Sequence, residues 1–419
     1  MLLRTGIRSV VTCMFLAAGL LAARTSRAQP DPMVYVSQWG DFGGATGQFD
    51  IPYGIAVDGG GNVYVSDYVN NRIQKFDSNG NFLLAFGVGG TGAGQLNAPF
   101  GLACDALNNI YVAEDQNHRV SKFNSGGGFL TSWGGIAPGN ANGQFRNPSG
   151  IALDDSGYVY VADTGNNRIQ KFSPTGVYVT KWGTTGSGNS QFRTPKGVCA
   201  DHHGGIYVVE TDNNRVQKFD ANGTYVGQWG SLGLTDGKFN QPSGIASDHA
   251  DNVYLVDTGN NRIQKFTPDG AFLGKWGTAG SGPGQMGNPF AVALRQNFEL
   301  YLADSYNYRV ERFAPNTAVG VGLPGARGGV SLVVSPNPAR GMVSLRISIP
   351  SADLGAKLEI LDAAGGRIAR LRPDTREGGA YAALWDLRKG DGRRVSPGLY
   401  FARFTSRHGS KTVKVTVLE

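Results

Sequence analysis

Cysteine and histidine are scarce in this chain, which has three cysteines and five histidines among 419 residues. So few cysteines exclude a disulfide-stapled scaffold. Beyond the first 28 residues only Cys104 and Cys199 remain, in non-adjacent units of a repeating pattern, and we expect both to be buried free thiols. No histidine falls in a strand expected to line a channel, so neither a histidine-ligated metal nor any other cofactor is predicted. The histidines are His118, His202, His203, His249 and His408.

A long apolar run is also missing. Arg4 and Arg8 precede an apolar run over residues 10–23, and Ser26-Arg27-Ala28 has the small-x-small pattern of a cleavage site. About 14 apolar residues are too few to span a bilayer, which needs about 20. Residues 1–28 are therefore predicted to be a signal peptide, and the mature chain is expected to be exported without a membrane span.

Charged residues make up 17% of the chain and are divided unevenly. Residues 29–329 contain 20 basic and 24 acidic side chains, whereas residues 330–419 contain 15 basic and 8 acidic ones. The formal net charge of +7 therefore does not describe the larger segment. Because phosphate backbones are bound by positively charged surfaces, nucleic acid is not predicted to be a partner of that segment.

What the chain contains in abundance is repetition. Six segments end in Arg-Ile/Val-x-Lys/Arg-Phe, and their arginines are 47, 49, 47, 47 and 47 residues apart. An aromatic residue followed by glycine recurs in step, at Trp39, Phe86, Trp133, Trp182, Trp229 and Trp276. A period of this length with four short β-type runs per unit is typical of propeller blades, which stack around an axis to bury their faces. The sequence predicts an all-β fold with six blades.

The third repeat illustrates one unit. Its predicted strands cover residues 151–153, 159–162, 168–172 and 178–182, and the turns between them are rich in asparagine, glycine, aspartate and proline. The third and fifth repeats both read Asp-Thr-Gly-Asn-Asn-Arg-Ile-Gln-Lys-Phe, and on these motifs residues 33–313 resemble the NHL family of six-bladed propellers. The resemblance implies an NHL-type propeller over residues 29–313. The second and sixth repeats depart from the pattern, and the sixth has Ala291 where a glycine is usual.

The two ends of the repeat region predict how the ring closes. The last repeat stops after its third strand, at Phe313, whereas residues 33–39 form an isolated fourth strand ahead of the first repeat. We expect this N-terminal strand to complete the sixth blade, which leaves no open sheet edge between the first and last blades.

An acidic residue stands five positions before every repeat arginine. Four turn residues separate the two, so acid and arginine are expected to flank the base of one hairpin and form a charge-assisted pair. Because the pair recurs in all six repeats, we predict a structural role. The pairs are Asp67 with Arg72, Glu114 with Arg119, Asp163 with Arg168, Glu210 with Arg215, Asp257 with Arg262, and Asp304 with Arg309.

Residues 314–329 are rich in glycine, proline and alanine and are predicted to be a flexible linker. Beyond it, alternating runs at 343–349, 358–361, 383–387, 399–405 and 412–417 predict a small β-sandwich over residues 330–419. Its Ser-Pro-Asn-Pro, Trp-Asp-Leu-Arg and Val-Ser-Pro-Gly-Leu-Tyr motifs resemble the type A sorting domain of the type IX secretion system. They equally resemble the Ig-like domain of flagellar hook-cap proteins.

The sorting resemblance implies that outer-membrane secretion machinery is a partner of the tail. It also implies that the protein is secreted or lies at the cell surface of a Gram-negative bacterium. The alternative is that the tail is an ordinary adhesion-type sandwich.

The candidate ligand site lies where each innermost strand begins. The residue after the proline that leads into this strand is expected to line the mouth of the channel, and around the ring it is Tyr53, Phe100, Ser149, Lys196, Ser243 and Phe290. Closure places the sixth repeat beside the first, so Phe290, Tyr53 and Phe100 are expected to form one aromatic arc. Tyr68, Tyr306 and Tyr308 are expected nearby. The alternative is that these rings only cap the core.

These observations predict a monomeric, exported, non-catalytic scaffold that binds a protein, peptide or glycan at the mouth of the propeller. Aromatic rings in a concave mouth suit sugar faces and apolar side chains. The alternative is an enzyme with its site in the channel, because six-bladed propellers include lyases and lactonases.

Overall fold

The structure, a computed structural model, describes residues 33–295, 298–315, 331–335, 339, 343–348, 356–371, 374–375, 380–407 and 409–418. The predicted signal peptide, residues 1–28, lies outside the described residues, as do His408 and all but the first two residues of the predicted linker. In the part of the chain that is described, no helix is long and apolar enough to cross a membrane.

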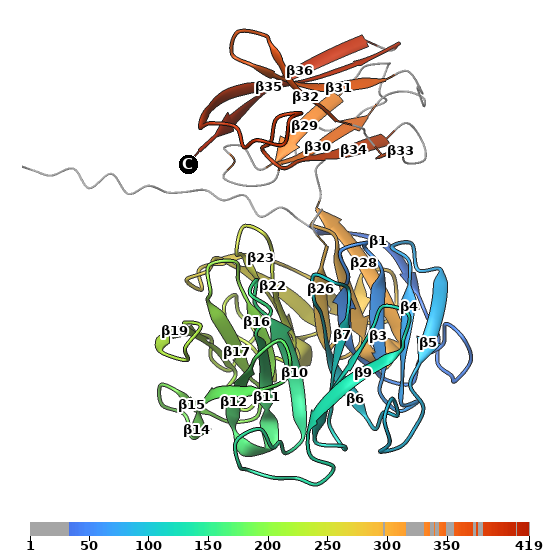
Figure 1. The fold of residues 1–419 in the computed structure, drawn as a ribbon, viewed down its shortest axis with the longest axis vertical. Coiled ribbons are helices and arrows are strands. Elements are labelled where there is room, and N and C mark those ends of the chain that lie inside the picture. Colours follow the sequence, from blue (N-terminus) through green and yellow to red (C-terminus); the bar gives the residue numbers. More distant parts are fainter. Residues whose placement is uncertain are drawn as a thin grey trace, which may run out of the picture.

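Within residues 33–315, leaving out 296–297, the strands form six four-stranded antiparallel sheets, and Figure 1 shows that they are arranged in a propeller-like manner. The first sheet contains β2 (Pro52–Val57), β3 (Val63–Asp67), β4 (Arg72–Phe76) and β5 (Phe82–Phe86). The second contains β6 (Pro99–Cys104), β7 (Ile110–Glu114), β8 (Arg119–Phe123) and β9 (Phe129–Gly134). The third contains β10 (Pro148–Leu153), β11 (Val159–Asp163), β12 (Arg168–Phe172) and β13 (Tyr178–Trp182).

The remaining sheets follow the same order. The fourth contains β16 (Pro195–Ala200), β17 (Ile206–Glu210), β18 (Arg215–Phe219) and β19 (Tyr225–Trp229). The fifth contains β20 (Ile245–Ser247), β21 (Val253–Asp257), β22 (Arg262–Phe266) and β23 (Phe272–Trp276). The sixth contains β26 (Ala291–Leu294), β27 (Leu300–Asp304), β28 (Arg309–Pro315) and β1 (Met33–Trp39).

Short elements occupy some of the loops. Two parallel pairs join β14 (Thr184–Thr185) to β15 (Gln191–Phe192) and β24 (Thr278–Ala279) to β25 (Gln285–Met286). Three 3₁₀ turns, η1 (Thr164–Asn166), η2 (Thr258–Asn260) and η3 (Ser305–Asn307), connect second to third strands. Each of these turns ends on a residue with φ near +50°, and Asn167 and Asn261 fill this position in η1 and η2 because asparagine tolerates left-handed backbone.

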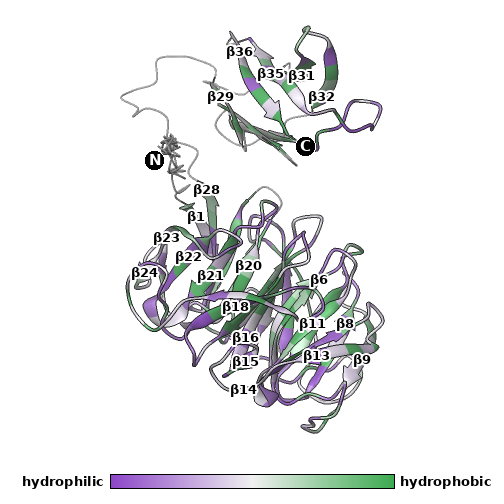
Figure 2. Cartoon of the chain, turned by 90° about the vertical axis from the view of Figure 1, so that its left-hand side faces the viewer, coloured by the Kyte–Doolittle hydropathy of each residue, from purple (hydrophilic) through white to green (hydrophobic). Residues whose placement is uncertain are grey.

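The sheets pack face to face around a common centre. The first strands β2, β6, β10, β16, β20 and β26 each contact the next, and β26 contacts β2 to close the cycle. The second strand of every sheet is buried along its whole length. Because neighbouring sheets cover both faces of this strand, most of its residues are apolar on both faces. Figure 2 labels two of these strands, β11 and β21, and shows hydrophobic residues in both.

Adjacent sheets share hydrophobic clusters. Tyr301 of the sixth sheet packs with Val63 and Phe76 of the first, and the clusters between the other neighbouring sheets are built in the same way. Both cysteines are free: Cys199 is buried and Cys104 is half-buried.

The N-terminal strand closes the ring as the sequence predicts. Strand β1 pairs antiparallel with β28, from Met33 opposite Pro315 to Trp39 opposite Val310. The sixth sheet is therefore assembled from both ends of the region. Strand β28 ends at Pro315, so Ala314 and Pro315 are strand residues and not the start of the linker, because they pair with Val34 and Met33.

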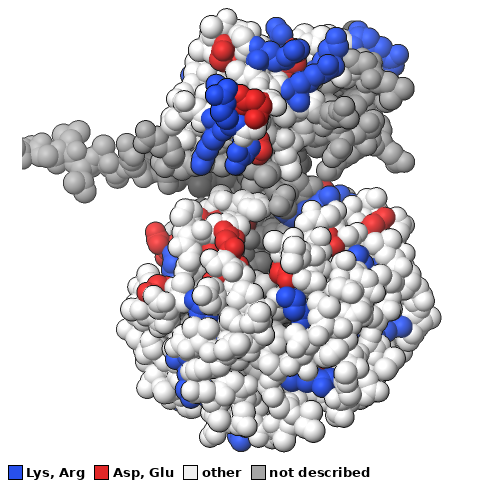
Figure 3. Space-filling view, in the orientation of Figure 1, with Lys and Arg blue, Asp and Glu red and all other residues white. Residues whose placement is uncertain are grey.

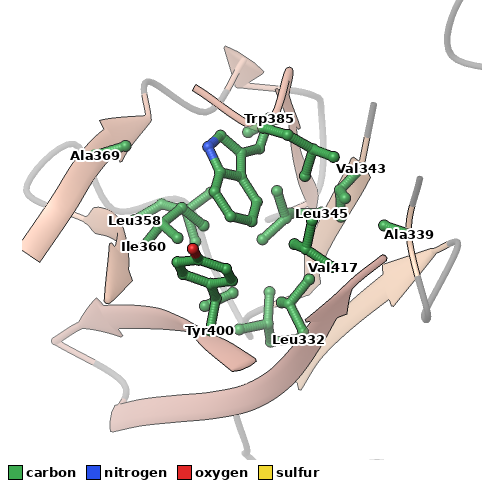
Figure 4. Close-up of a cluster of buried hydrophobic side chains, with 14 of the residues drawn as sticks. Leu332, Ala339, Val343, Leu345, Leu358, Ile360, Ala369, Trp385, Tyr400 and Val417 are labelled. Carbon is green, nitrogen blue, oxygen red and sulfur yellow. The ribbon is translucent and has the colours of Figure 1, made fainter. Parts of the chain in front are cut away.

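The C-terminal part forms two further four-stranded sheets. One contains β29 (Ser331–Ser335), β30 (Val343–Ser348), β34 (Ala380–Trp385) and β33 (Asp374–Thr375). The other contains β32 (Arg367–Leu371), β31 (Lys357–Asp362), β35 (Gly398–Ser406) and β36 (Gly409–Val417). Residues of both sheets share one core in which Trp385 packs against Tyr400, with ring centroids 5.6 Å apart (Figure 4). Five of these eight strands, β30, β31, β34, β35 and β36, overlap the runs that the alternating pattern predicts, whereas β29, β32 and β33 are not predicted by it.

Candidate ligand-binding site

Three aromatic rings from three sheets pack against one another at the centre of the ring. Tyr53 lies in β2, Phe100 lies in β6, and Phe290 directly precedes β26. The ring centroids are 4.3 Å apart for Tyr53 and Phe290, 4.9 Å for Tyr53 and Phe100, and 5.2 Å for Phe100 and Phe290. The sequence predicts an arc of separate rings, whereas the structure forms a cluster in which each ring touches the other two. We call these three residues the aromatic cluster.

The aromatic cluster lines a hollow at the centre of the six first strands, where the sequence predicts the mouth of a channel. The hollow measures about 280 Å³, which includes space open to solvent, and Lys196 and Ser243 also line it. All six sheets contribute to it through residues at matching positions in the first strand or, in the fifth sheet, directly before it. These are Gly54, Gly101, Gly150, Gly197 and Gly244, with Ala291 next to Phe290.

Glycine is required at these positions because the sheets approach each other closely. A Cβ atom on Gly54 would lie 2.0 Å from the carbonyl oxygen of Phe100, and one on Gly150 would lie 2.2 Å from the carbonyl oxygen of Lys196. The mouth is therefore built on tightly packed backbone, which holds the side chains after each proline in fixed positions. In the sixth sheet Ala291 takes the place of the glycine.

Lys196 is the charged group that lines the hollow. Its Nζ atom lies 4.9 Å from the centroid of the Phe290 ring, within the range of a cation–π interaction. Burial lowers the pKa of Lys196, since desolvation disfavours the ammonium form, while Asp212 and Asp115 act in the opposite direction.

The structure places two of the three additional tyrosines near the aromatic cluster. The ring of Tyr68 lies 4.7 Å from that of Tyr53, and its hydroxyl donates to Asp115 at 3.2 Å. Burial and the adjacent carboxylate raise the pKa of Tyr68 to about 12. Tyr306 is exposed and lies close enough to Tyr53 to contribute to the raised pKa of Tyr53, of which burial is the larger cause.

The ring of Tyr308 packs against Phe42, and no contact with the aromatic cluster is seen among the ring pairs of the described residues, so its predicted place near the ligand stays a prediction. Tyr308 occupies the left-handed position at the end of η3, with φ of 53°, which is the place of the second asparagine in other repeats. This backbone conformation directs its ring to Phe42, at a centroid distance of 4.9 Å.

The six acid–arginine pairs all form. The arginine Nε lies 2.5 to 2.8 Å from a carboxylate oxygen in each pair, and the carboxylate side chains have no exposed surface. The other guanidinium nitrogens donate to backbone carbonyls of the loop that leads into the same sheet. Those of Arg168 reach Asn140, Ala141 and Gln144 at 2.7, 2.9 and 2.8 Å. Each arginine therefore fastens a loop to a hairpin, which is a structural arrangement.

Sequence reasoning missed a buried acid beside the last of these pairs. The residue two positions after the repeat arginine is glutamine in four sheets and serine in one, but it is Glu311 in the sixth. Glu311 has no exposed surface, and its pKa is raised to about 7 by burial and by the charge of Asp304. Arg309 lies 3.1 Å from Glu311 and lowers this pKa, yet it is shared with Asp304 and only partly offsets the burial. The sequence does contain a signal for this residue, because the same position is uncharged in the other five repeats.

Histidines from neighbouring repeats meet in the loops between first and second strands. His202 stacks on His249 with centroids 4.7 Å apart, and its Nδ1 atom lies 3.0 Å from Asp155. His203 pairs with Asp251 at 2.5 Å. Burial and the nearby His202 lower the pKa of His249. Over the described ranges, no three His, Cys, Asp or Glu side chains are grouped so that they would hold a metal ion.

Charge is distributed as the sequence predicts. In the view of Figure 3, lysine and arginine side chains gather on the C-terminal sheets, whereas the sheets of residues 33–315 show scattered charges of both signs. The surface of the repeat region in this view therefore has no extended basic patch.

Four segments of the chain, residues 49–76, 145–172, 192–219 and 239–266, match the NHL repeat family. The B-box type zinc finger protein ncl-1 of Caenorhabditis elegans is 44% identical over 57 residues, which are 14% of this chain and 7% of that protein. Protein brain tumor of Drosophila melanogaster is 40% identical over 62 residues, which are 15% of this chain and 6% of that protein. The chain thus spans less than a tenth of either relative.

Among solved structures, a structural-genomics protein of unknown function from Bacteroides thetaiotaomicron superimposes with a TM-score of 0.51 at 17% identity. This match covers 68% of this chain and 74% of that one. A streptogramin B lyase superimposes with a TM-score of 0.49 at 17% identity, covering 68% of this chain and 98% of the lyase. Identities this low indicate a shared fold and nothing about activity. The matched repeats, the sheet order and the superposition on the Bacteroides thetaiotaomicron structure together show that the chain contains NHL repeats in a β-propeller fold.

Proposed function

We propose that this chain is an exported six-bladed propeller that binds a ligand at its channel mouth without chemical conversion. The observation that carries the proposal is the aromatic cluster of Tyr53, Phe100 and Phe290 beside Lys196 in one hollow. The aromatic cluster offers apolar contact area, and Lys196 offers one positive charge. This combination suits recognition of a protein, peptide or glycan.

The distribution of the rings supports a binding role over a packing role. A residue needed to cap the core should be large in every sheet, but the equivalent positions in the third and fifth sheets are Ser149 and Ser243. All three rings of the aromatic cluster are only half-buried. In contrast, the tyrosine in the second strand of each sheet recurs six times and is buried.

The test is a screen of the full chain on glycan and peptide arrays, followed by the double variant Tyr53→Ala with Phe290→Ala. We expect the variant to lose every interaction that the wild-type chain makes on the arrays. A matched control is Phe42→Ala with Tyr308→Ala, which removes another pair of touching rings outside the aromatic cluster. Retained binding by the Tyr53 and Phe290 variant would place the ligand site elsewhere.

We further propose that residues 330–419 are an Ig-like domain that directs secretion to the cell surface. Two four-stranded sheets around the Trp385 core and a surplus of basic residues support an independent domain with its own partner. The chain is expected to be a monomer whose propeller and tail act separately.

A further inference from the structure

The charge pattern of the channel mouth narrows the class of ligand, an inference that rests on the proposed function. Of the six residues that follow the prolines at the mouth, Lys196 alone is charged. Its ammonium group faces the ring of Phe290, so a ligand that contacts the aromatic cluster also meets this charge.

Within the residues that the structure describes, the carboxylates of Asp212 and Asp115 act on Lys196 through their charge and not through a hydrogen bond. The two carboxylates that influence it most accept hydrogen bonds from other groups. Asp115 accepts from Tyr68 at 3.2 Å and from Gln116 at 2.7 Å, and Asp212 accepts from the Thr194 hydroxyl at 2.5 Å. A partly buried ammonium without a bonded carboxylate is a strong site for an anionic group supplied by a ligand.

The backbone carbonyls of the mouth are partly occupied by hydrogen bonds within the fold. The carbonyl oxygens of Phe100, Lys196 and Phe290 each already accept a hydrogen bond from a serine hydroxyl of the preceding sheet. The donors are Ser66, Ser149 and Ser243, at 2.7, 3.1 and 2.6 Å. One lone pair of each of these oxygens is therefore already used, and the ring faces and one cation are the contacts that the side chains of the mouth offer to a ligand.

We propose that the mouth binds an acidic sugar, a uronic acid residue of an oligosaccharide, with its carboxylate on Lys196 and its apolar face on the aromatic cluster. The hollow is shallow, open to solvent on one side and lined almost entirely by apolar atoms, so the sugar ring lies over the aromatic cluster rather than inside an enclosed cavity. The ring of Tyr53 and the ring of Phe290, 4.3 Å apart, supply the apolar contact.

The experiment compares trigalacturonate with its fully methyl-esterified form, which keeps the sugar rings and removes the charges. Isothermal titration with the full chain is expected to show binding of the acid about 10- to 100-fold tighter than binding of the ester, the range of a charge-assisted contact. Lys196→Met should reduce the affinity for the acid until it equals the affinity of the same variant for the ester. Lys196→Arg should retain the preference, and Lys181→Met on the exposed strand β13 is the matched control.

The outcomes separate this inference from the proposed function. Equal binding of acid and ester, unchanged binding by Lys196→Met in a protein with wild-type thermal unfolding, or no binding of either form would overturn the acidic-sugar inference. Binding of a peptide that is lost in the Tyr53→Ala, Phe290→Ala variant would also overturn it while the proposed function stands. Binding of either sugar that survives in that double variant would contradict the proposed function itself.

Discussion

The ring of Tyr53 packs against the ring of Phe290 with centroids 4.3 Å apart, although one residue lies in the first repeat and the other in the last. The contact crosses the seam where the ring closes, between β2 and β26, and these two strands touch each other directly. The candidate site thus depends on closure, and closure depends on the pairing of β1 with β28.

Removal of the closing strand tests this dependence. Deletion of residues 33–40 removes β1 and exposes the edge of β28 together with Phe76, against which Trp39 packs in the intact chain. Because an open edge and apolar surface favour association, we expect aggregation or loss of a cooperative thermal transition. Size-exclusion chromatography and calorimetry measure both effects. A truncated chain that stays monomeric and melts at the wild-type temperature would show that β1 is not needed for closure.

Each repeat arginine binds a loop through several hydrogen bonds. We therefore expect a substitution that keeps the positive charge but removes these hydrogen bonds to lower the stability of the fold strongly. Arg168→Lys retains a cation near Asp163 but leaves the carbonyls of Asn140, Ala141 and Gln144 without the guanidinium donors. We expect a loss of about 2–4 kcal/mol in the free energy of unfolding, measured by urea denaturation. Arg193→Lys, at an exposed position, is the control and should change little. Similar stabilities for the two variants would contradict the role.

The buried Glu311 predicts a pH dependence with a defined sign. The pKa of Glu311 is about 7 in the folded chain, whereas an unperturbed glutamate has a pKa of 4.5. Between pH 4.5 and pH 7 the folded chain therefore binds more protons than the unfolded chain. Stability should therefore fall as the pH rises from 4.5 to 7. Glu311→Gln, which restores the residue of most other repeats, should be more stable than wild type by about 1–3 kcal/mol at pH 8 and nearly equal at pH 5.

The reverse substitution serves as the control for Glu311. Gln264→Glu places an acid at the equivalent buried position of the fifth sheet, beside Asp257. It should introduce a second loss of stability over the same pH range, measured by urea denaturation at pH 5, 6.5 and 8. Identical pH profiles for wild type and Glu311→Gln would show that Glu311 is ionised in the folded state at little cost.

The proposed sorting role of the tail predicts a change in location without a change in the propeller. A chain that ends at residue 329 should accumulate in the periplasm of a host with the matching secretion machinery, because the address has been removed. Cell fractionation measures the location, and calorimetry of the purified fragment shows whether the propeller is folded. Normal appearance of the folded fragment at the cell surface or in the medium would leave only a structural role for the tail.

Much of the fold follows from local patterns in the sequence. The Trp39-Gly40 pair marks a fourth strand that has no first three strands ahead of it, so the repeat count alone assigns it to the sixth sheet, where it pairs with β28. The acid–arginine spacing likewise brings Asp163 and Arg168 to opposite ends of a tight turn. Both predictions depend only on the spacing of a few residues along the chain or on the number of repeats. Either quantity can be read directly from the sequence.

The details of the candidate site depend on distances between repeats, which the sequence does not contain. The sequence places Tyr53, Phe100 and Phe290 at equivalent positions of three repeats. Whether their rings touch depends on the distance between the first strands of neighbouring sheets. The glycine contacts make the channel narrow, so the rings meet. The position of Tyr308 could not be predicted because its left-handed backbone, a conformation that is unusual for tyrosine, turns the ring toward Phe42.

The free energy of unfolding of the Tyr53→Ala, Phe290→Ala variant tests the central claim most directly, because it needs no knowledge of the ligand. If the aromatic cluster is a binding surface, urea denaturation should show a loss of less than about 2 kcal/mol, well below the cost of removing core rings. Tyr160→Ala, which removes one fully buried ring from β11, should lose about 3–5 kcal/mol. A double variant that is destabilised as much as Tyr160→Ala, or that fails to fold, would show that the aromatic cluster is part of the core and would contradict the account.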